Sequence, residues 1–167
     1  MNEYFPDAQE AYPSAPLWRR LAAMFYDTLL LIALWFVTTG LYLAVIGAVI
    51  GADTLHQQAD QGHFDRNPFL GSLLFVETFF FFAYFWRKLG QTLGMQVWRV
   101  RIQSDDGRRL RWTQCILRFM GALFSALPAG LGYWWMLWDK EGKTWHDKYS
   151  LSRVVLMPSA KASKRQG

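Results

Sequence analysis

Two long apolar segments constrain this chain more than any other feature. Residues 29–50 form a run of 22 residues with no charged side chain, and residues 69–86 form a run of 18 in which Glu77 is the only charged one. At 1.5 Å per residue, helices of these lengths would reach about 33 and 27 Å, close to the bilayer hydrocarbon thickness of about 30 Å. We therefore predict an integral membrane protein with at least two membrane-spanning helices.

The flanking composition predicts three parts along the chain. Residues 1–16 contain three acidic residues and three prolines but no Lys or Arg, unlike a signal peptide, and we expect a flexible tail there. Residues 17–157 form the expected transmembrane domain, with helices at about 17–51 and 69–86, and residues 158–167 form a basic tail. The single cysteine, Cys115, cannot form an internal disulfide and is expected to be a small packing residue.

A third apolar block, residues 112–138, contains Arg118 and is interrupted at residues 128–132 (PAGLG). It would cross the bilayer as one helix, or enter and leave on one side if it is broken at Pro128. Basic residues collect in cytoplasmic loops. With the polar loop 52–68 outside and both chain ends inside, 16 of the 18 Lys and Arg residues become cytoplasmic, which favours the broken, re-entrant form.

A small β element is expected on the cytoplasmic side. Residues 98–103 alternate apolar with polar side chains, residues 104–107 (SDDG) suggest a turn, and the alternation resumes at Leu110 and Trp112. This pattern predicts a β-hairpin over about 97–111, and a strand at about 150–156 could pair with it. The predicted fold class is an all-α integral membrane protein with two to four transmembrane or re-entrant helices and a small cytoplasmic β-hairpin or strand element.

Three short motifs resemble the RDD family of bacterial membrane proteins. Residues 20–27 (RLAAMFYD) open the first helix, residues 90–95 (GQTLGM) follow the second, and residues 145–148 (WHDK) follow the third block. The resemblance covers roughly residues 16–157 and places the arginine and the two aspartates of the family name at Arg20, Asp27 and Asp147. It implies little about activity, since the family is largely uncharacterised and transport is a suggestion only. For Asp147 it favours pairing with an arginine near the membrane, which would anchor the cytoplasmic strands.

Three charged residues on the apolar segments are candidates for an intramembrane site, namely Asp27, Glu77 and Arg118. Arg20 is expected to reach lipid phosphates, and Asp27 lies either at the inner interface or within the bilayer with a cation such as Arg118 as its partner. Glu77 lies in the middle of its helix beside four phenylalanines. It either forms a hydrogen bond with a neighbouring helix as a neutral acid, binds a proton or cation, or pairs with Arg118.

Other patterns give weaker expectations. Gly47 and Gly51 form a GxxxG pattern suited to helix packing or to an intermolecular contact. His56 and His63 share the outer loop with three Asp, but their spacing matches no metal site. His146 and Asp147 are interpreted as a turn with a solvated histidine rather than a catalytic pair.

Two classes of function remain. The first is a membrane packing or accessory protein of the inner membrane, with both termini cytoplasmic, whose basic face meets anionic lipid headgroups and whose helices contact other membrane proteins or further copies of the chain. The second is a small homo-oligomeric transporter of protons or monovalent cations that uses Asp27, Glu77 and Arg118. Because no catalytic motif is present, we expect no enzyme, no cofactor, no metal and no nucleic-acid partner.

Overall fold

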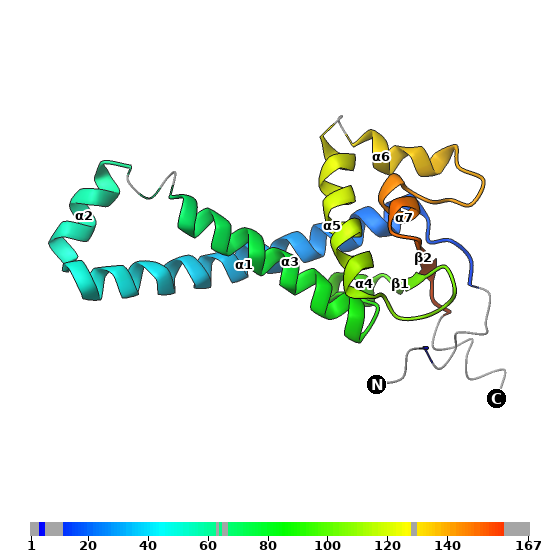
Figure 1. The fold of residues 1–167 in the computed structure, drawn as a ribbon, viewed down its shortest axis with the longest axis horizontal. Coiled ribbons are helices and arrows are strands. Elements are labelled where there is room, and N and C mark those ends of the chain that lie inside the picture. Colours follow the sequence, from blue (N-terminus) through cyan, green and yellow to red (C-terminus); the bar gives the residue numbers. More distant parts are fainter. Residues whose placement is uncertain (1–3, 6–11, 63, 65–66, 128–129, 159–167) are drawn as a thin grey trace. The chain divides into compact units, whose positions relative to one another are not determined.

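The computed structural model describes residues 4–5, 12–62, 64, 67–127 and 130–158. The chain is mostly helical with one small sheet (Figure 1). In order along the chain, the elements are α1 (Leu17–Ile50), α2 (Ala52–Asp60), α3 (Pro68–Lys88), α4 (Leu93–Val97), β1 (Val100–Ser104), α5 (Trp112–Ala126), α6 (Leu131–Trp134), η1 (Trp135–Leu137), α7 (Trp145–Tyr149) and β2 (Ser152–Leu156).

By length and composition, α1 and α3 are each suited to cross a membrane. The helix α5 and the segment Leu131–Leu137 would add a third span if they were one element, but they meet at an angle of 109°. The membrane class and the small strand element predicted from the sequence are thus confirmed. The expected break at Pro128 and Ala129 lies outside the described residues.

The chain divides into two compact units. The hairpin unit comprises residues 28–80, that is most of α1, all of α2 and the first part of α3. Within it Trp35 donates to Thr78 at 3.0 Å, and Asn67 donates to Tyr42 at 3.1 Å. The segment expected to be a loop, residues 52–68, contains a helix, α2. Gly51, with a φ of 89°, is the single residue between the end of α1 and the start of α2. His63, Asp65 and Arg66 of that loop lie outside the described residues.

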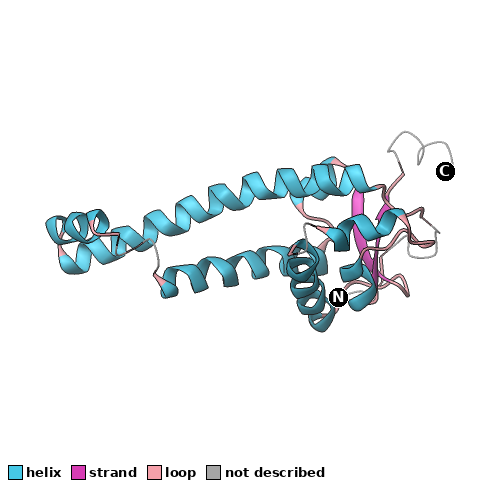
Figure 2. Cartoon of the chain, turned by 90° about the horizontal axis from the view of Figure 1, so that it is seen from above, coloured by secondary structure: helices cyan, strands magenta, loops and turns pink. Residues whose placement is uncertain are grey.

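The sheet unit comprises residues 1–27 and 81–167. Its two strands are antiparallel, with Val100 opposite Leu156 and Ser104 opposite Ser152 (Figure 2). The predicted hairpin over 97–111 is therefore wrong. Residues after the Ser104–Gly107 turn have an isolated bridge at Arg108 rather than a second strand, because β2, from much later in the chain, occupies the partner position. Residue 97 belongs to α4.

Residues 12–16 are not the flexible tail that the sequence suggested. Ala15 donates from its backbone N–H to Val154, and Leu156 donates to Pro13, at 3.0 and 2.9 Å. Prolines and small residues suit this role, because Pro13 needs only its carbonyl to join the edge of β2. The segment before α1 is therefore held by the segment after α7.

The sheet unit contains one supersecondary motif twice. Thr92 caps α4 and Thr144 caps α7, each hydroxyl accepting from the backbone N–H three residues later. Both helices end at a residue with φ −92° and ψ 3°, followed by a non-glycine residue with positive φ, Arg99 at 56° and Leu151 at 49°. A strand then begins in each copy, so the two segments share the helix cap, the helix end and the residue of positive φ at equivalent positions.

The two copies are related by a pseudo-twofold axis that passes through the sheet. Ile102 pairs with Val154, its own equivalent in the other copy. The N–H of Asp105 donates to Leu151 at 3.1 Å, and the N–H of Met157 donates to Arg99 at 2.8 Å, which is the same contact in the reverse direction. An interaction made by one copy therefore has a counterpart in the other unless the side chains differ.

The correspondence extends to the helices that pack on α4 and α7. On α1, Ala23 contacts Gly94 closely, and on α5, Gly121 contacts the equivalent residue, His146. The spacing from Arg20 to Ala23 equals the spacing from Arg118 to Gly121. Arg20 and Arg118 are therefore equivalent residues of the two copies.

Candidate functional site: a buried carboxylate between two arginines

The main polar cluster of the sheet unit is an ionic triad of Arg20, Asp147 and Arg118. One guanidinium nitrogen of Arg20 lies 2.6 Å from one carboxylate oxygen of Asp147, and one of Arg118 lies 2.5 Å from the other oxygen. The three side chains are 8, 0 and 5% exposed. The single negative charge of Asp147 is thus shared by two buried guanidiniums. Charge-assisted hydrogen bonds of this length are among the strongest in proteins.

Local structure fixes each member of the triad. Asp147 is the third residue of α7 and also accepts from the backbone N–H of Thr144 at 3.1 Å, completing a capping box. Arg118 donates to the hydroxyl of Ser152 at 2.7 Å, which ties α5 to β2. Arg20 also donates to the backbone oxygens of Ala15, Gly142 and Val154. The triad therefore joins α1, α5, α7 and β2 at one point.

The electrostatics of the cluster follow from this geometry. Burial alone raises the pKa of Asp147, but the Arg118 and Arg20 guanidiniums outweigh it and hold that pKa well below its usual range. Burial lowers the pKa of His146 to about 3, and the two arginines act in the same direction. His146 is therefore neutral at physiological pH and packs against the Tyr133 ring, with 4.8 Å between the ring centroids. It is not the solvated histidine that the sequence suggested.

Asp27 belongs to a separate polar contact. Its carboxylate accepts from the Thr92 hydroxyl at 2.5 Å and from the backbone N–H of Gly94 at 2.9 Å. It does not pair with Arg118, whose guanidinium is bound to Asp147. The carboxylate lies at the start of α4, where exposed helix N–H groups favour a negative charge. Asp27 thus attaches α1 to the first copy of the motif.

Glu77 lies in the hairpin unit. One of its carboxyl oxygens accepts from the Thr38 hydroxyl at 2.6 Å, while the other is buried without a hydrogen-bond partner among the described residues. A hydrogen bond to a neighbouring helix was one of the three alternatives for this residue. Arg118, the partner considered in another of these alternatives, is paired with Asp147 within the sheet unit.

Both glycines of the GxxxG pattern have roles within one chain. A Cβ on Gly47 would lie 3.0 Å from Leu55 of α2, so Gly47 allows that contact. Gly51 precedes α2 with a φ of 89°, a conformation that side chains rarely adopt. In the described part of the chain, no group of three His, Cys, Asp or Glu residues is placed to hold a metal ion.

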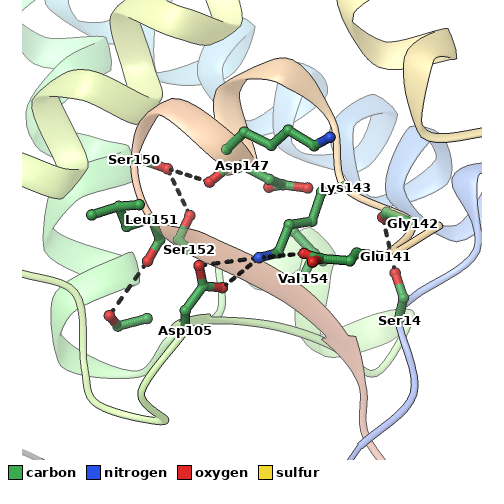
Figure 3. A network of polar contacts seen from close by, with 12 residues as sticks. Ser14, Asp105, Glu141, Gly142, Lys143, Asp147, Ser150, Leu151, Ser152 and Val154 are labelled. Atoms are coloured by element: carbon green, nitrogen blue, oxygen red, sulfur yellow. Dashed lines mark hydrogen bonds and ion pairs between the residues drawn. The ribbon is translucent and has the colours of Figure 1, made fainter. Parts of the chain in front are cut away.

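Sequence reasoning missed the threonines and serines that complete these contacts, Thr92, Thr144 and Ser152. It also missed an ionic network in which Lys143 lies 3.0 Å from Asp105 and 2.9 Å from Glu141 (Figure 3). A signal for the repeat was present in the sequence. Five identical pairs recur at one spacing in the two copies, namely Trp86 and Trp138, Lys88 and Lys140, Gly90 and Gly142, Thr92 and Thr144, and Arg101 and Arg153.

The fold and the triad together define a helical membrane protein with a buried Arg–Asp–Arg cluster. The sequence profile of the RDD family matches residues 14–150, and the chain belongs to this family. The search of curated proteins and the search of solved structures each gave no match.

Proposed function

We propose that this protein is a multi-pass protein of the cell inner membrane that acts as a packing or accessory protein and not as an enzyme. The observation that carries the proposal is that the buried charges of the sheet unit have fixed partners. Arg20 and Arg118 share Asp147, and Asp27 is bound by Thr92 and Gly94. Ion or proton transfer needs groups that exchange partners, whereas these contacts hold helices together.

Both termini are proposed to be cytoplasmic. Residues 13–15 precede α1 and pair with β2, and β1 follows α3 and also pairs with β2. Segments of one small sheet have to share a side of the membrane, because loops with unpaired backbone groups do not lie in lipid. Two crossings, by α1 and α3, satisfy this condition. The bent segment from α5 to η1 would then enter and leave on one side.

In this proposed topology, a basic group of residues lies at the inner boundary of the bilayer. The Arg87 guanidinium lies 4.4 Å from the centre of the Trp112 ring. Lys88 follows Arg87 in the sequence, and Arg109 and Arg111 come just before Trp112. Tryptophan favours the headgroup level, and basic residues attract anionic lipids there. We expect native mass spectrometry to detect more bound phosphatidylglycerol than phosphatidylcholine, and less of it on the Arg87→Gln, Arg111→Gln variant. Equal retention of both lipids would contradict this partner.

Proteoliposomes test the accessory role. A pH gradient across the vesicle membrane should persist when Na⁺ or K⁺ is added, both for the wild type and for Glu77→Gln. Cation-dependent loss of the gradient in the wild type, abolished in the variant, would refute the accessory role and establish transport.

Transport by a homo-oligomer is the second candidate, and Glu77 is the observation that favours it. A carboxyl oxygen that is buried without a hydrogen-bond partner in the described structure can accept a proton, a cation or a donor from another chain. Since two or three helices cannot enclose a solvated path, this role requires several copies. A strict monomer in mild detergent would eliminate it.

A further inference from the structure

Two arginines at equivalent positions of the two strands have different surroundings. Arg101 on β1 is 4% exposed and donates to the side-chain oxygen of Gln103 at 3.0 Å. The centres of the Phe5 and Tyr12 rings lie 4.4 and 5.3 Å from its guanidinium. In the first copy, the guanidinium is therefore covered by side chains of the same chain.

Arg153 on β2 is the equivalent of Arg101 and lacks these partners. Val155 lies at the position that corresponds to Gln103, and a valine side chain cannot accept a hydrogen bond. Within the described part of the chain, the Arg153 side chain forms no ion pair, and its Nε is buried without a hydrogen-bond partner. A buried donor without an acceptor costs free energy, so a ligand that brings an acceptor is favoured here.

A cavity of about 400 Å³ lies at Arg153 and offers space for such a ligand. Its lining is mostly polar. The charged and hydroxyl groups that line it come from Ser14, Arg20, Asp105, Glu141, Lys143 and Arg153. The cavity is therefore suited to a small charged group rather than to an apolar one.

The charges at this cavity indicate which sign the ligand has. Lys143 is bound by two carboxylates, at 3.0 Å from Asp105 and 2.9 Å from Glu141 (Figure 3). The triad, which reaches the cavity through Arg20, has one carboxylate for its two guanidiniums. With Arg153 included, four positive groups stand against three carboxylates. One singly charged anion would balance them.

A phosphate group suits these donors. Arginine presents a planar fork of N–H groups that binds phosphate oxygens in pairs. Arg153 comes from β2 and Lys143 from the segment just before α7, so positive groups reach the cavity from two elements. The oxygens of a phosphate point in several directions and can face both elements at once, whereas those of a carboxylate lie in one plane.

We propose that the cavity beside Arg153 binds a singly charged phosphate group, either of a free phosphate ester or of a phospholipid headgroup. The Arg153 guanidinium donates to the phosphate oxygens, which take the place that Gln103 has beside Arg101. Arg20 contributes charge rather than a new hydrogen bond, since it already donates to Asp147 and to backbone oxygens. The site is built on the sheet, so it does not depend on the role of the membrane helices.

The test uses the full chain in dodecylmaltoside micelles, labelled with ¹⁵N, and follows the Arg153 Nε–H and Gly142 amide signals by NMR. Glycerophosphoglycerol, a soluble phosphodiester with one negative charge, should shift both signals in a saturable way at constant ionic strength. Sodium chloride at the same concentrations should not. A response that does not saturate, an equal response to chloride, or no response would each overturn the proposal.

A matched pair of variants separates a local site from general attraction of anions. Arg153→Gln should weaken binding of glycerophosphoglycerol, followed at Gly142, by about tenfold, because charge-assisted hydrogen bonds are lost. Lys140→Gln removes an equal charge from an exposed side chain that does not line this cavity, and it should bind as the wild type does. Equal weakening by the two variants would refute the site.

Val155→Gln tests the origin of the site in the missing partner. It gives Arg153 the amide oxygen that Gln103 gives to Arg101, and this oxygen should compete with the phosphate and weaken its binding. If the variant folds, as judged by its amide spectrum, and binds the probe as tightly as the wild type, Arg153 is not the phosphate ligand.

A lipid probe distinguishes the two sources of the phosphate. Dihexanoylphosphatidylglycerol carries the same phosphodiester as glycerophosphoglycerol, with two short acyl chains added. Equal dissociation constants for the two probes would support a free phosphate ester as the ligand. Tighter binding of the lipid, weakened by Arg153→Gln, would support a phospholipid headgroup.

Discussion

The buried triad predicts a large loss of stability when its carboxylate becomes neutral. Asp147→Asn keeps the shape of the side chain but leaves Arg20 and Arg118 facing each other without a counter-charge. Breaking a buried ion pair in this way costs about 3–5 kcal/mol, and the upper half of that range applies because two arginines lose their partner. At about 2–4 °C per kcal/mol for a chain of this size, the melting temperature should fall by about 8–20 °C.

Cys115 provides the assay for this prediction. It is the only cysteine of the chain and is fully buried, so a thiol-reactive dye reports unfolding without further labels. Asp106→Asn is the control, because Asp106 forms an exposed pair with Arg108 at 3.4 Å and such pairs contribute about 0–1 kcal/mol. Adding Arg118→Met to Asp147→Asn should recover part of the loss, since one uncompensated charge is removed. If Asp147→Asn melts within 2 °C of the wild type, the triad does not stabilise the fold.

Three further predictions follow from the same geometry. Between pH 7 and pH 5 the free energy of unfolding should fall by about 2 kcal/mol. Only the unfolded state protonates His146 in this range, because the pKa of His146 is about 3 in the folded state. Chemical denaturation at both pH values measures this, and His146→Gln should remove the dependence. Met95 is the twofold equivalent of Asp147. When Met95→Asp is added to Asp147→Met, it should therefore reverse at least half of the fall in melting temperature that Asp147→Met causes. No recovery would mean that the two arginines are not symmetrically placed. Thr92→Val removes both a helix cap and the hydrogen bond to Asp27 and should cost about 1–2 kcal/mol in thermal unfolding, whereas an unchanged melting temperature would show that this contact is dispensable.

The membrane helices could be predicted from the sequence because uncharged runs of this length have few other uses in proteins. The limits of α1 and α3 lie within a few residues of the expected ones. The sheet was harder to predict. Alternation at residues 98–103 correctly indicated a strand, but a nearby turn suggested a local hairpin, and pairing between segments distant in sequence leaves no local signal. The strand at about 150–156 was recognisable, and its pairing with the 97–111 region was expected and is observed, but as the only strand partner of β1 in the described part of the chain rather than as an addition to a local hairpin.

The partners of the charged residues were likewise predictable only in part. The expectation that Asp147 pairs with an arginine matches the observed contacts, although Arg20 itself was expected to reach lipid phosphates. Arg118 was linked to Asp27 and Glu77 because all three lie on apolar segments, but proximity depends on how α5 packs against α7. That packing rests on Gly121 and His146, which are in close contact. Neither residue is distinctive in sequence, so only the structure identifies which carboxylate each arginine meets.

The pairing of residues 13–15 with β2 has a consequence for the order of folding. Arg20 is separated from Asp147 by 127 positions, so the first arginine leaves the ribosome long before its carboxylate is made. During that interval the apolar helices can insert into the membrane, while Arg20 and Arg118 remain without their buried partner. The sheet unit can complete its fold only after β2 has been synthesised. Truncation within the last strand should therefore leave inserted helices with an unfolded sheet unit, since contacts between such distant segments form late.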